Sequence, residues 1–121
     1  MQKGDTKIAL YGLSHIPDRR LFHLFKENKI CVMKPDLGEL FHIMVLHQNR
    51  ADRGPKNYIP ENMLPSFLDL VVWGHEHDCR IEPEETEHNF RITQPGSSVA
   101  TSLCEGEAIT KKVGILHVRY N

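Results

Sequence analysis

Two short apolar segments, each followed by histidine, constrain the fold of this chain more than any other feature. The first runs from Phe41 to Leu46, is apolar except at His42, and leads directly into His47. The second covers residues 70–73 and leads through a glycine into the segment 75–77, which has histidine at both ends. Runs of this kind are typical of strands covered on both faces, as in parallel sheets. The pattern predicts an α/β layer whose strands present histidines at their carboxyl ends.

The rest of the chain predicts a mixed α/β (α+β) fold with a β-rich second half. Residues 7–12 read as a strand, and a helix is expected to begin near Pro17, where apolar residues then recur at helical spacing. The remaining expectations are a loop over residues 48–60, a short helix over 60–68, a strand over 69–73, a turn or hairpin tip in the acidic stretch after Ile81, and strands over 90–93 and 114–118. A length of 121 residues fits one domain.

Composition limits the class of protein. The formal net charge of −1 gives no overall attraction to nucleic acid, so phosphate binding would need local basic patches. The three cysteines lie far apart without a Cys-x-x-Cys spacing, which is typical of reduced thiols inside the cell. The sequence shows no signal peptide and no apolar run long enough to span a bilayer. We therefore expect a soluble protein of the cytosol or nucleus that does not bind membranes.

The histidines at the two predicted strand ends indicate metal chemistry. Open α/β sheets place ligands beyond the carboxyl ends of their strands, and imidazole suits Zn, Mn, Fe, Ni and Cu. His47, His75 and His77 are therefore candidate metal ligands. The alternative is that these rings are hydrogen-bonded at the edge of the core and bind nothing. For the other histidines we expect a surface or satisfied core position: His15, His23, His42, His88 and His117.

Two further segments are candidate contacts for a phosphate group. Asn49 and Arg50 follow His47, and an arginine can hold a phosphate with two parallel hydrogen bonds. Residues 94–98 follow a predicted strand, and the hydroxyls of Ser97 and Ser98 could donate to phosphate oxygens. On sequence chemistry alone, a plain turn is the favoured explanation of residues 94–98.

Taken together, these motifs resemble the calcineurin-like metallophosphoesterases, and within them the eukaryotic Mre-eleven branch of DNA nucleases. The resemblance is collinear over nearly the whole chain. It is carried by the segments Ile8-Ala9-Leu10-Tyr11-Gly12-Leu13, Ile16-Pro17-Asp18, His47-Gln48-Asn49-Arg50, Asn57-Tyr58-Ile59-Pro60-Glu61, Val72-Trp73-Gly74-His75-Glu76-His77 and Gln94-Pro95-Gly96-Ser97-Ser98.

The resemblance implies a β-sandwich flanked by helices, with two Mn ions that support exonuclease and endonuclease action on DNA ends in double-strand-break repair. It implies a nuclear location, DNA as the substrate, and a Rad-type SMC ATPase and an Nbs-type subunit as partners of the complete protein. By the same resemblance, His47 and His75 would ligate one metal and His77 the other. Asn49, Arg50 and residues 94–98 would line the rim of the active site.

The chain departs from the family in a way that bears on activity. The family's Asp-x-His, its Gly-Asp with the bridging carboxylate, and its Gly-Asn-His-Glu with the catalytic histidine have no counterpart here, since Gly4-Asp5 lacks the context. We therefore expect residues 1–121 to be the second half of a phosphoesterase domain, without the family's N-terminal half, capping domain or C-terminal tail. No catalytic residue is assigned, and the isolated chain is predicted to be inactive as a nuclease.

Three functional hypotheses remain open from the sequence. The chain is a part of a Mn-dependent DNA nuclease, or a catalytically dead truncated paralogue that acts as an interaction or single-metal module, or a structural protein whose histidines bind no metal. At most one ion would bind weakly to three histidines alone, and Zn could replace Mn there. We also expect the sheet to be incomplete, with exposed apolar edges that invite a homodimer.

Overall fold

The two apolar segments form neighbouring parallel strands in the computed structural model, which describes residues 1–120. They are β3 (Phe41–His47) and β4 (Leu70–Gly74). Ile43 lies opposite Leu70, and at the other end His47 lies opposite Gly74. The carboxyl ends of both strands therefore meet at one edge of the sheet, as the sequence predicts.

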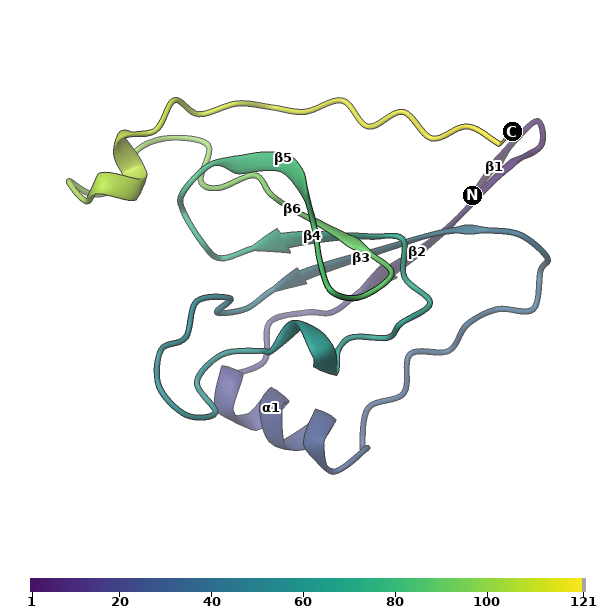
Figure 1. The fold of residues 1–121 in the computed structure, drawn as a ribbon, viewed down its shortest axis with the longest axis horizontal. Coiled ribbons are helices and arrows are strands. Elements are labelled where there is room, and N and C mark those ends of the chain that lie inside the picture. Colours follow the sequence, from purple (N-terminus) through teal and green to yellow (C-terminus); the bar gives the residue numbers. More distant parts are fainter. Residues whose placement is uncertain (121) are drawn as a thin grey trace.

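The sheet has six strands in the order β1-β2-β3-β4-β6-β5 (Figure 1). β2 (Thr6–Gly12), β3, β4 and β6 (Arg91–Gln94) run parallel. The short β1 (Gln2–Lys3) and β5 (Arg80–Glu85) are antiparallel and form the two edges. The expectation of a mixed α/β fold with a β-rich second half is confirmed.

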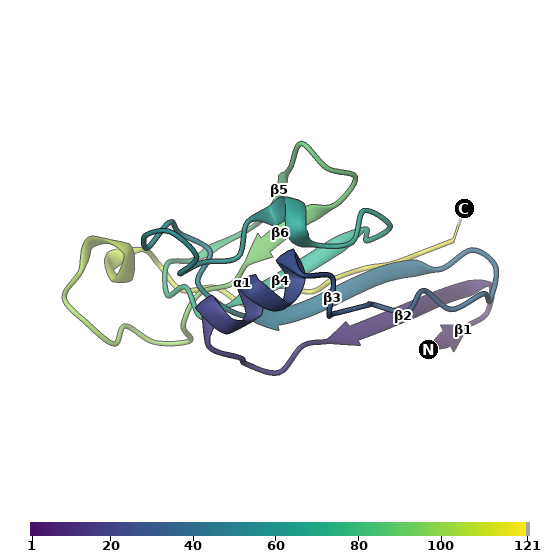
Figure 2. The same cartoon turned by 90° about the horizontal axis from the view of Figure 1, so that it is seen from below.

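One face of the sheet carries the hydrophobic core. Because side chains alternate along a strand, Met44 and Leu46 of β3 and Trp73 of β4 point to the same side. Helix α1 (Asp18–Lys26) lies against this face and contributes the fully buried Leu21. Figure 2 shows α1 in front of the strands when the molecule is seen from below.

The opposite face is crossed by the C-terminal segment, residues 109–120. In Figure 1 this segment runs as an extended yellow trace on the side away from α1 and ends close to β1. The backbone N–H of Tyr120 donates to the hydroxyl of Thr6 at 3.0 Å, which fixes its end. The predicted strand over residues 114–118 is wrong, because the segment is extended but has no neighbouring backbone to pair with in the described part of the chain. Ile115 is consequently 85% exposed.

Two further predictions need correction. The helix expected over residues 60–68 is only a 3₁₀ turn, η1 (Glu61–Met63), because Leu64 precedes Pro65 and adopts the extended backbone that a following proline favours. The acidic stretch after Ile81 is not a turn, since it forms most of β5. The turn lies later, where the Thr86 hydroxyl donates to the carbonyl oxygen of Phe90. Within residues 1–120, no helix combines the length and apolar character needed to cross a membrane.

Candidate metal centre

His47 and His75 lie side by side at the carboxyl ends of β3 and β4. Their ring centroids are 5.2 Å apart and the rings are nearly perpendicular, at 79°. Gly74 permits this approach, because a Cβ atom at this position would lie 3.0 Å from His47 Nδ1. A larger residue would need the His47 ring to move by a few tenths of an ångström. The structure therefore brings together the two histidines that the resemblance assigns to one metal.

The backbone at His75 is held in an unusual conformation. Its φ of +85° lies in the left-handed region, which residues with a Cβ adopt at a cost of about 1–3 kcal/mol. Glu76 stabilises the turn that follows, since its buried carboxylate accepts hydrogen bonds from the backbone N–H groups of Arg50 and Ala51 at 2.7 and 3.1 Å. Residues of two neighbouring strand ends are thereby tied together at the point of strain.

The ionisation of Glu76 suits this role. Burial raises the pKa of its carboxyl, but the two backbone N–H groups and the guanidinium of Arg53, 3.0 Å away, lower it by more. The net result is a pKa below the usual value for glutamate. The charged form is therefore the one that links the tips of β3 and β4.

His15 also lies at this edge of the sheet, a position that the two apolar segments did not predict. Its Nδ1 donates to the carbonyl oxygen of His47 at 3.0 Å, and the two ring centroids lie 6.0 Å apart. β2 ends at Gly12 beside β3, so the segment that follows is a third strand tip at the same edge. Applying the strand-end rule to β2 as well would have identified His15.

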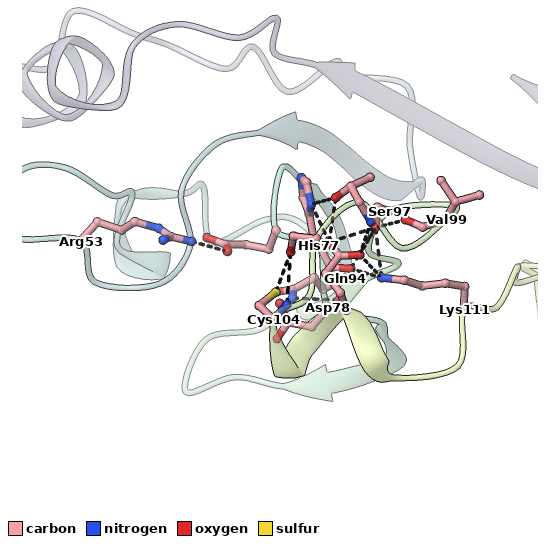
Figure 3. A network of polar contacts seen from close by, with 12 residues as sticks. Arg53, His77, Asp78, Gln94, Ser97, Val99, Cys104 and Lys111 are labelled. Atoms are coloured by element: carbon pink, nitrogen blue, oxygen red, sulfur yellow. Dashed lines mark hydrogen bonds and ion pairs between the residues drawn. The ribbon is translucent and has the colours of Figure 1, made fainter.

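His77 lies in a separate polar network and not against the other two rings. Its Nδ1 is 2.7 Å from Glu107 Oε1 and 2.9 Å from the Thr101 hydroxyl. Figure 3 shows His77, Ser97 and Lys111 directed toward this one network. The His77 side chain is half exposed, whereas that of Glu107 is 1% exposed. A buried carboxylate thus holds one nitrogen of an accessible imidazole.

The Glu107 carboxylate is strongly stabilised as an anion. It belongs to the 3₁₀ turn η2 (Glu105–Ala108). The backbone N–H of Thr101 donates to Oε2 at 2.9 Å and is the main cause that lowers the pKa. Burial opposes this, but hydrogen bonds from His77 and Thr101 and the charge of Lys111 add to it, and the pKa falls to about 2. At neutral pH this carboxylate therefore only accepts hydrogen bonds.

Two glycines allow the chain to pack closely around His77 and Asp78. Gly96 has a φ of +77°, and a Cβ there would lie 2.5 Å from the carbonyl oxygen of His77. Gly106 docks η2 against Asp78, where a Cβ would lie 3.2 Å from that of the aspartate. A larger residue at position 96 would displace the loop that carries Ser97, and one at position 106 would need Asp78 to move by a few tenths of an ångström. The arrangement around His77 is therefore built by close backbone contacts.

The candidate phosphate contacts after β3 are largely engaged within the protein. The Arg50 guanidinium, whose side chain is 11% exposed, donates to Glu84 at 2.8 Å and to Gln94 at 2.9 Å. The Asn49 side chain donates to the carbonyl oxygen of Asn57. These partners favour a structural role that ties loop 48–60 to the rest of the fold. Contact of either residue with DNA stays a prediction.

The two candidate serines differ in position. The Ser97 hydroxyl donates to the carbonyl oxygen of Val99 at 2.8 Å and accepts from Lys111 Nζ at 3.0 Å. Ser98 is exposed at the tip of the same loop. Ser98 is thus the more accessible of the two for a phosphate group.

The fit of these side chains to a metal ion is partial. Imidazole nitrogens from His47 and His75 lie near each other, but within residues 1–120 no group of three or more His, Cys, Asp or Glu side chains converges as a metal site would require. Mn favours carboxylate oxygens, and those of Glu76 and Glu107 are engaged elsewhere. If His47 and His75 bind an ion, they would supply only part of its coordination sphere, and further ligands would be needed to complete it.

Comparison with known proteins shows strong similarity along almost the whole length of this chain. The double-strand break repair protein MRE11 of Macaca fascicularis and that of Homo sapiens are each 52% identical over 122 residues, which covers 98% of this chain. This chain matches one segment of the MRE11 proteins. The MRE11 of Arabidopsis thaliana is 50% identical over 129 residues. No protein-family model matches the chain.

The match covers almost all of this chain but only a small part of each relative. The chain spans 17% of the length of the MRE11 proteins of Macaca fascicularis and Homo sapiens, and 18% of that of Arabidopsis thaliana. The resemblance to the Mre-eleven branch, drawn from the motifs at the strand ends, is confirmed. The similarity covers the segment that contains His47, His75 and His77.

Proposed function

We propose that this chain forms part of a Mn-dependent nuclease domain that cleaves DNA phosphodiesters in double-strand-break repair. The supporting observation is the meeting of His47 and His75 at adjacent strand ends in a chain 52% identical to MRE11 of Homo sapiens. Because its relatives are named for double-strand break repair, we propose DNA ends as the substrate. Residues 1–121 would constitute the second half of such a domain.

The three histidines have different tasks in this proposal. His47 and His75 would hold one ion through neighbouring imidazoles, with Gly74 giving the His47 ring its place. His77 would offer its Nε2 to the second ion, because Nδ1 faces Glu107. Two bound ions would activate water and neutralise the charge that develops on the phosphate. Ser98, at the exposed loop tip, is placed to donate a hydrogen bond to the DNA backbone.

The isolated chain is expected to lack nuclease activity. A two-metal centre holds its ions about 3.5–4 Å apart, and carboxylates normally bridge the two ions and offset their charge. His47, His75 and His77 contribute neutral donors only. A site made from these rings alone would bind at most one ion, weakly, and Zn would compete with Mn.

The wider setting of the proposal follows the resemblance. A complete protein of this kind would act in the nucleus and assemble with a Rad-type SMC ATPase and an Nbs-type subunit. None of the surfaces described above is assigned to either partner.

A chimera tests the proposal directly. The matching segment of Homo sapiens MRE11 is replaced by this chain, and Mn-dependent degradation of linear duplex DNA is measured. We expect activity in the chimera and its loss on His75→Ala. His117→Ala, which removes an exposed imidazole far along the C-terminal segment, is the matched control and should keep the activity. A folded chimera that is inactive would favour the alternative, a catalytically dead interaction or single-metal module.

Metal titration of the 121-residue chain separates the remaining hypotheses. Calorimetry with Mn and then Zn should detect weak binding that His47→Ala or His75→Ala abolishes and that His117→Ala preserves. Binding that is indifferent to His47 and His75 would refute their assignment as ligands. Absence of binding in the wild-type chain, together with an inactive chimera, would support the structural hypothesis.

A further inference from the structure

Glu107 places a buried carboxylate against the ring of the candidate ligand His77. Its Oε1 lies 2.7 Å from His77 Nδ1, across thirty positions of sequence. The Glu107 side chain is 1% exposed while that of His77 is 53% exposed. A buried charge is costly unless it is paired and hydrogen-bonded, so the surroundings must favour this placement.

Several contacts besides the one to His77 hold the Glu107 carboxylate in place. The backbone N–H of Thr101 donates to Oε2 at 2.9 Å, and Lys111 Nζ lies 3.5 Å from the same oxygen. The Thr101 hydroxyl donates to Oε1 at 3.1 Å. Gly106 brings η2 into contact with Asp78, next to the histidine. The position of Oε1 relative to the His77 ring is therefore set by backbone and side-chain contacts together.

We infer that Glu107 is a positioning residue that holds His77 in the tautomer with hydrogen on Nδ1 and the lone pair on Nε2. An ionised carboxylate has no hydrogen to donate, so Nδ1 must be the donor. Nε2 is then the only nitrogen of the ring with a lone pair available to a metal ion. Carboxylates that orient ligating histidines in this way typically change metal affinity by about 10- to 100-fold.

The simpler explanation is that Glu107 only tethers residues 101–111 to the sheet. Lys111 also donates to the carbonyl oxygen of His77, so this segment has a second tether that does not involve the imidazole. A tether would affect stability but would not select a tautomer. The two explanations therefore differ in whether the hydrogen of the neutral His77 ring is fixed on Nδ1.

The test is the ¹⁵N spectrum of the histidine rings in the metal-free chain, recorded in solution alkaline enough for neutral imidazole. We expect His77 to show a protonated Nδ1 and an unprotonated Nε2. Glu107→Ala should shift His77 toward the tautomer mixture of an unrestrained imidazole. Glu107→Gln, whose amide oxygen can still accept the Nδ1 hydrogen, should retain the wild-type tautomer. Glu105→Ala, an exposed change in the same turn, is the matched control and should leave His77 unaltered.

The inference fails if Nδ1 of His77 is unprotonated in the wild-type chain, a result that needs no variant to fold. It also fails if a folded Glu107→Ala keeps the wild-type tautomer. The inference rests on the proposed function only where it concerns metal affinity. That part is tested in the chimera, where Mn affinity should fall about 10- to 100-fold in Glu107→Ala and little in Glu107→Gln. Metal binding that depends on His77 but not on Glu107 would refute the positioning role while leaving the proposed function intact.

Discussion

At the scale of single residues, the most telling feature is the backbone of His75. Its φ of +85° places a residue with a Cβ where glycine is the usual choice. Strain of this kind tends to persist where the surrounding structure over-determines the conformation, often at functional sites. Here the Glu76 carboxylate supplies that constraint through the backbone of the β3 tip. His75 therefore keeps an imidazole at a position whose backbone conformation favours glycine.

The strain can be measured with two substitutions that both remove the ring. His75→Gly should give a higher free energy of unfolding than His75→Ala, by about 1 kcal/mol, because glycine adopts this φ freely. Denaturant unfolding of the two variants provides the comparison. The same pair at His117, which is not among the residues with positive φ, should not favour glycine. Equal stability of the two variants at position 75 would argue against strain there.

At the scale of elements, the tip of β3 is organised by Gln48. This side chain is fully buried and bridges the tip to the loop before α1. Its Oε1 accepts from the backbone N–H of Ile16 at 3.1 Å, and its Nε2 donates to the carbonyl oxygen of Ile16 and to Asp18. The backbone carbonyl oxygen of Gln48, which is separate from the side-chain amide, accepts from the indole N–H of Trp73 on β4. The amide of Gln48 thus joins the tip of β3 to the start of α1, and its backbone joins the same tip to β4.

Gln48→Leu keeps the volume but removes the amide, and should lower the free energy of unfolding by about 3 kcal/mol because buried polar groups of the Ile16 loop lose their partner. Gln2→Leu, an exposed change of the same kind, should stay within about 0.5 kcal/mol of the wild type. Amide hydrogen exchange should accelerate at Ile16 in the first variant. Unchanged stability and exchange would mean that Gln48 does not hold this junction.

The two edges of the sheet are protected to different degrees. β5 carries several glutamates and Pro83, and its register shifts between Arg80 and Glu84, all of which discourage pairing with another strand. On the other edge, β1 covers only the start of β2. Residues 9–12 have no outer strand in the described structure, and Leu10 is 58% exposed. The expectation of an incomplete sheet therefore applies to the β2 side.

At the scale of the whole molecule, one face of the sheet is well covered and the other is not. α1 and the core residues cover the first face, whereas the second meets only the extended C-terminal segment. Val113 and Ile115 in that segment and Val45 in β3 remain exposed. Apolar surface of this extent favours association.

We therefore expect the 121-residue chain to self-associate as its concentration rises, with homodimers among the products. Light scattering over a concentration series measures this directly. Ile115→Lys should weaken the association, because it places a charge on the apolar surface. Asn89→Lys introduces the same charge on an exposed turn and should have no such effect. A wild-type chain that stays monomeric at the highest concentration would contradict the expectation.

Acid stability is also a property of the whole molecule. The pKa of Glu107 is about 2 in the folded chain, below its ordinary value of 4.5. A depressed pKa stabilises the folded state above the unfolded-state value, and this contribution is lost as pH falls through the folded-state value. In the presence of a metal chelator, the free energy of unfolding of the wild-type chain should thus decline from about pH 5 to about pH 2. The decline should be less steep in Glu107→Gln. Glu105→Gln serves as the control, and identical slopes in wild type and Glu107→Gln would refute this contribution.

The strands and their histidine ends could be predicted from the sequence because their cause is local. A run that is apolar at nearly every position predicts a buried strand, and the residues at its end are expected at the edge of the sheet, where His47 and His75 lie. The strand expected over residues 114–118 failed for the opposite reason. A strand needs a partner backbone, and the apolar pattern of those residues cannot supply one.

Long-range contacts decided what the sequence left open. Glu107 reaches His77 and Arg50 reaches Glu84 only because the fold brings distant segments together. No local pattern distinguishes a buried, hydrogen-bonded glutamate from a solvated one, or an arginine paired inside the protein from one available to DNA. The sequence by itself determined where the buried strands lie along the chain and which histidines follow them at the edge of the sheet. The tertiary structure alone decided which side chains hold those histidines, because burial and pairing depend on neighbours that are remote in sequence.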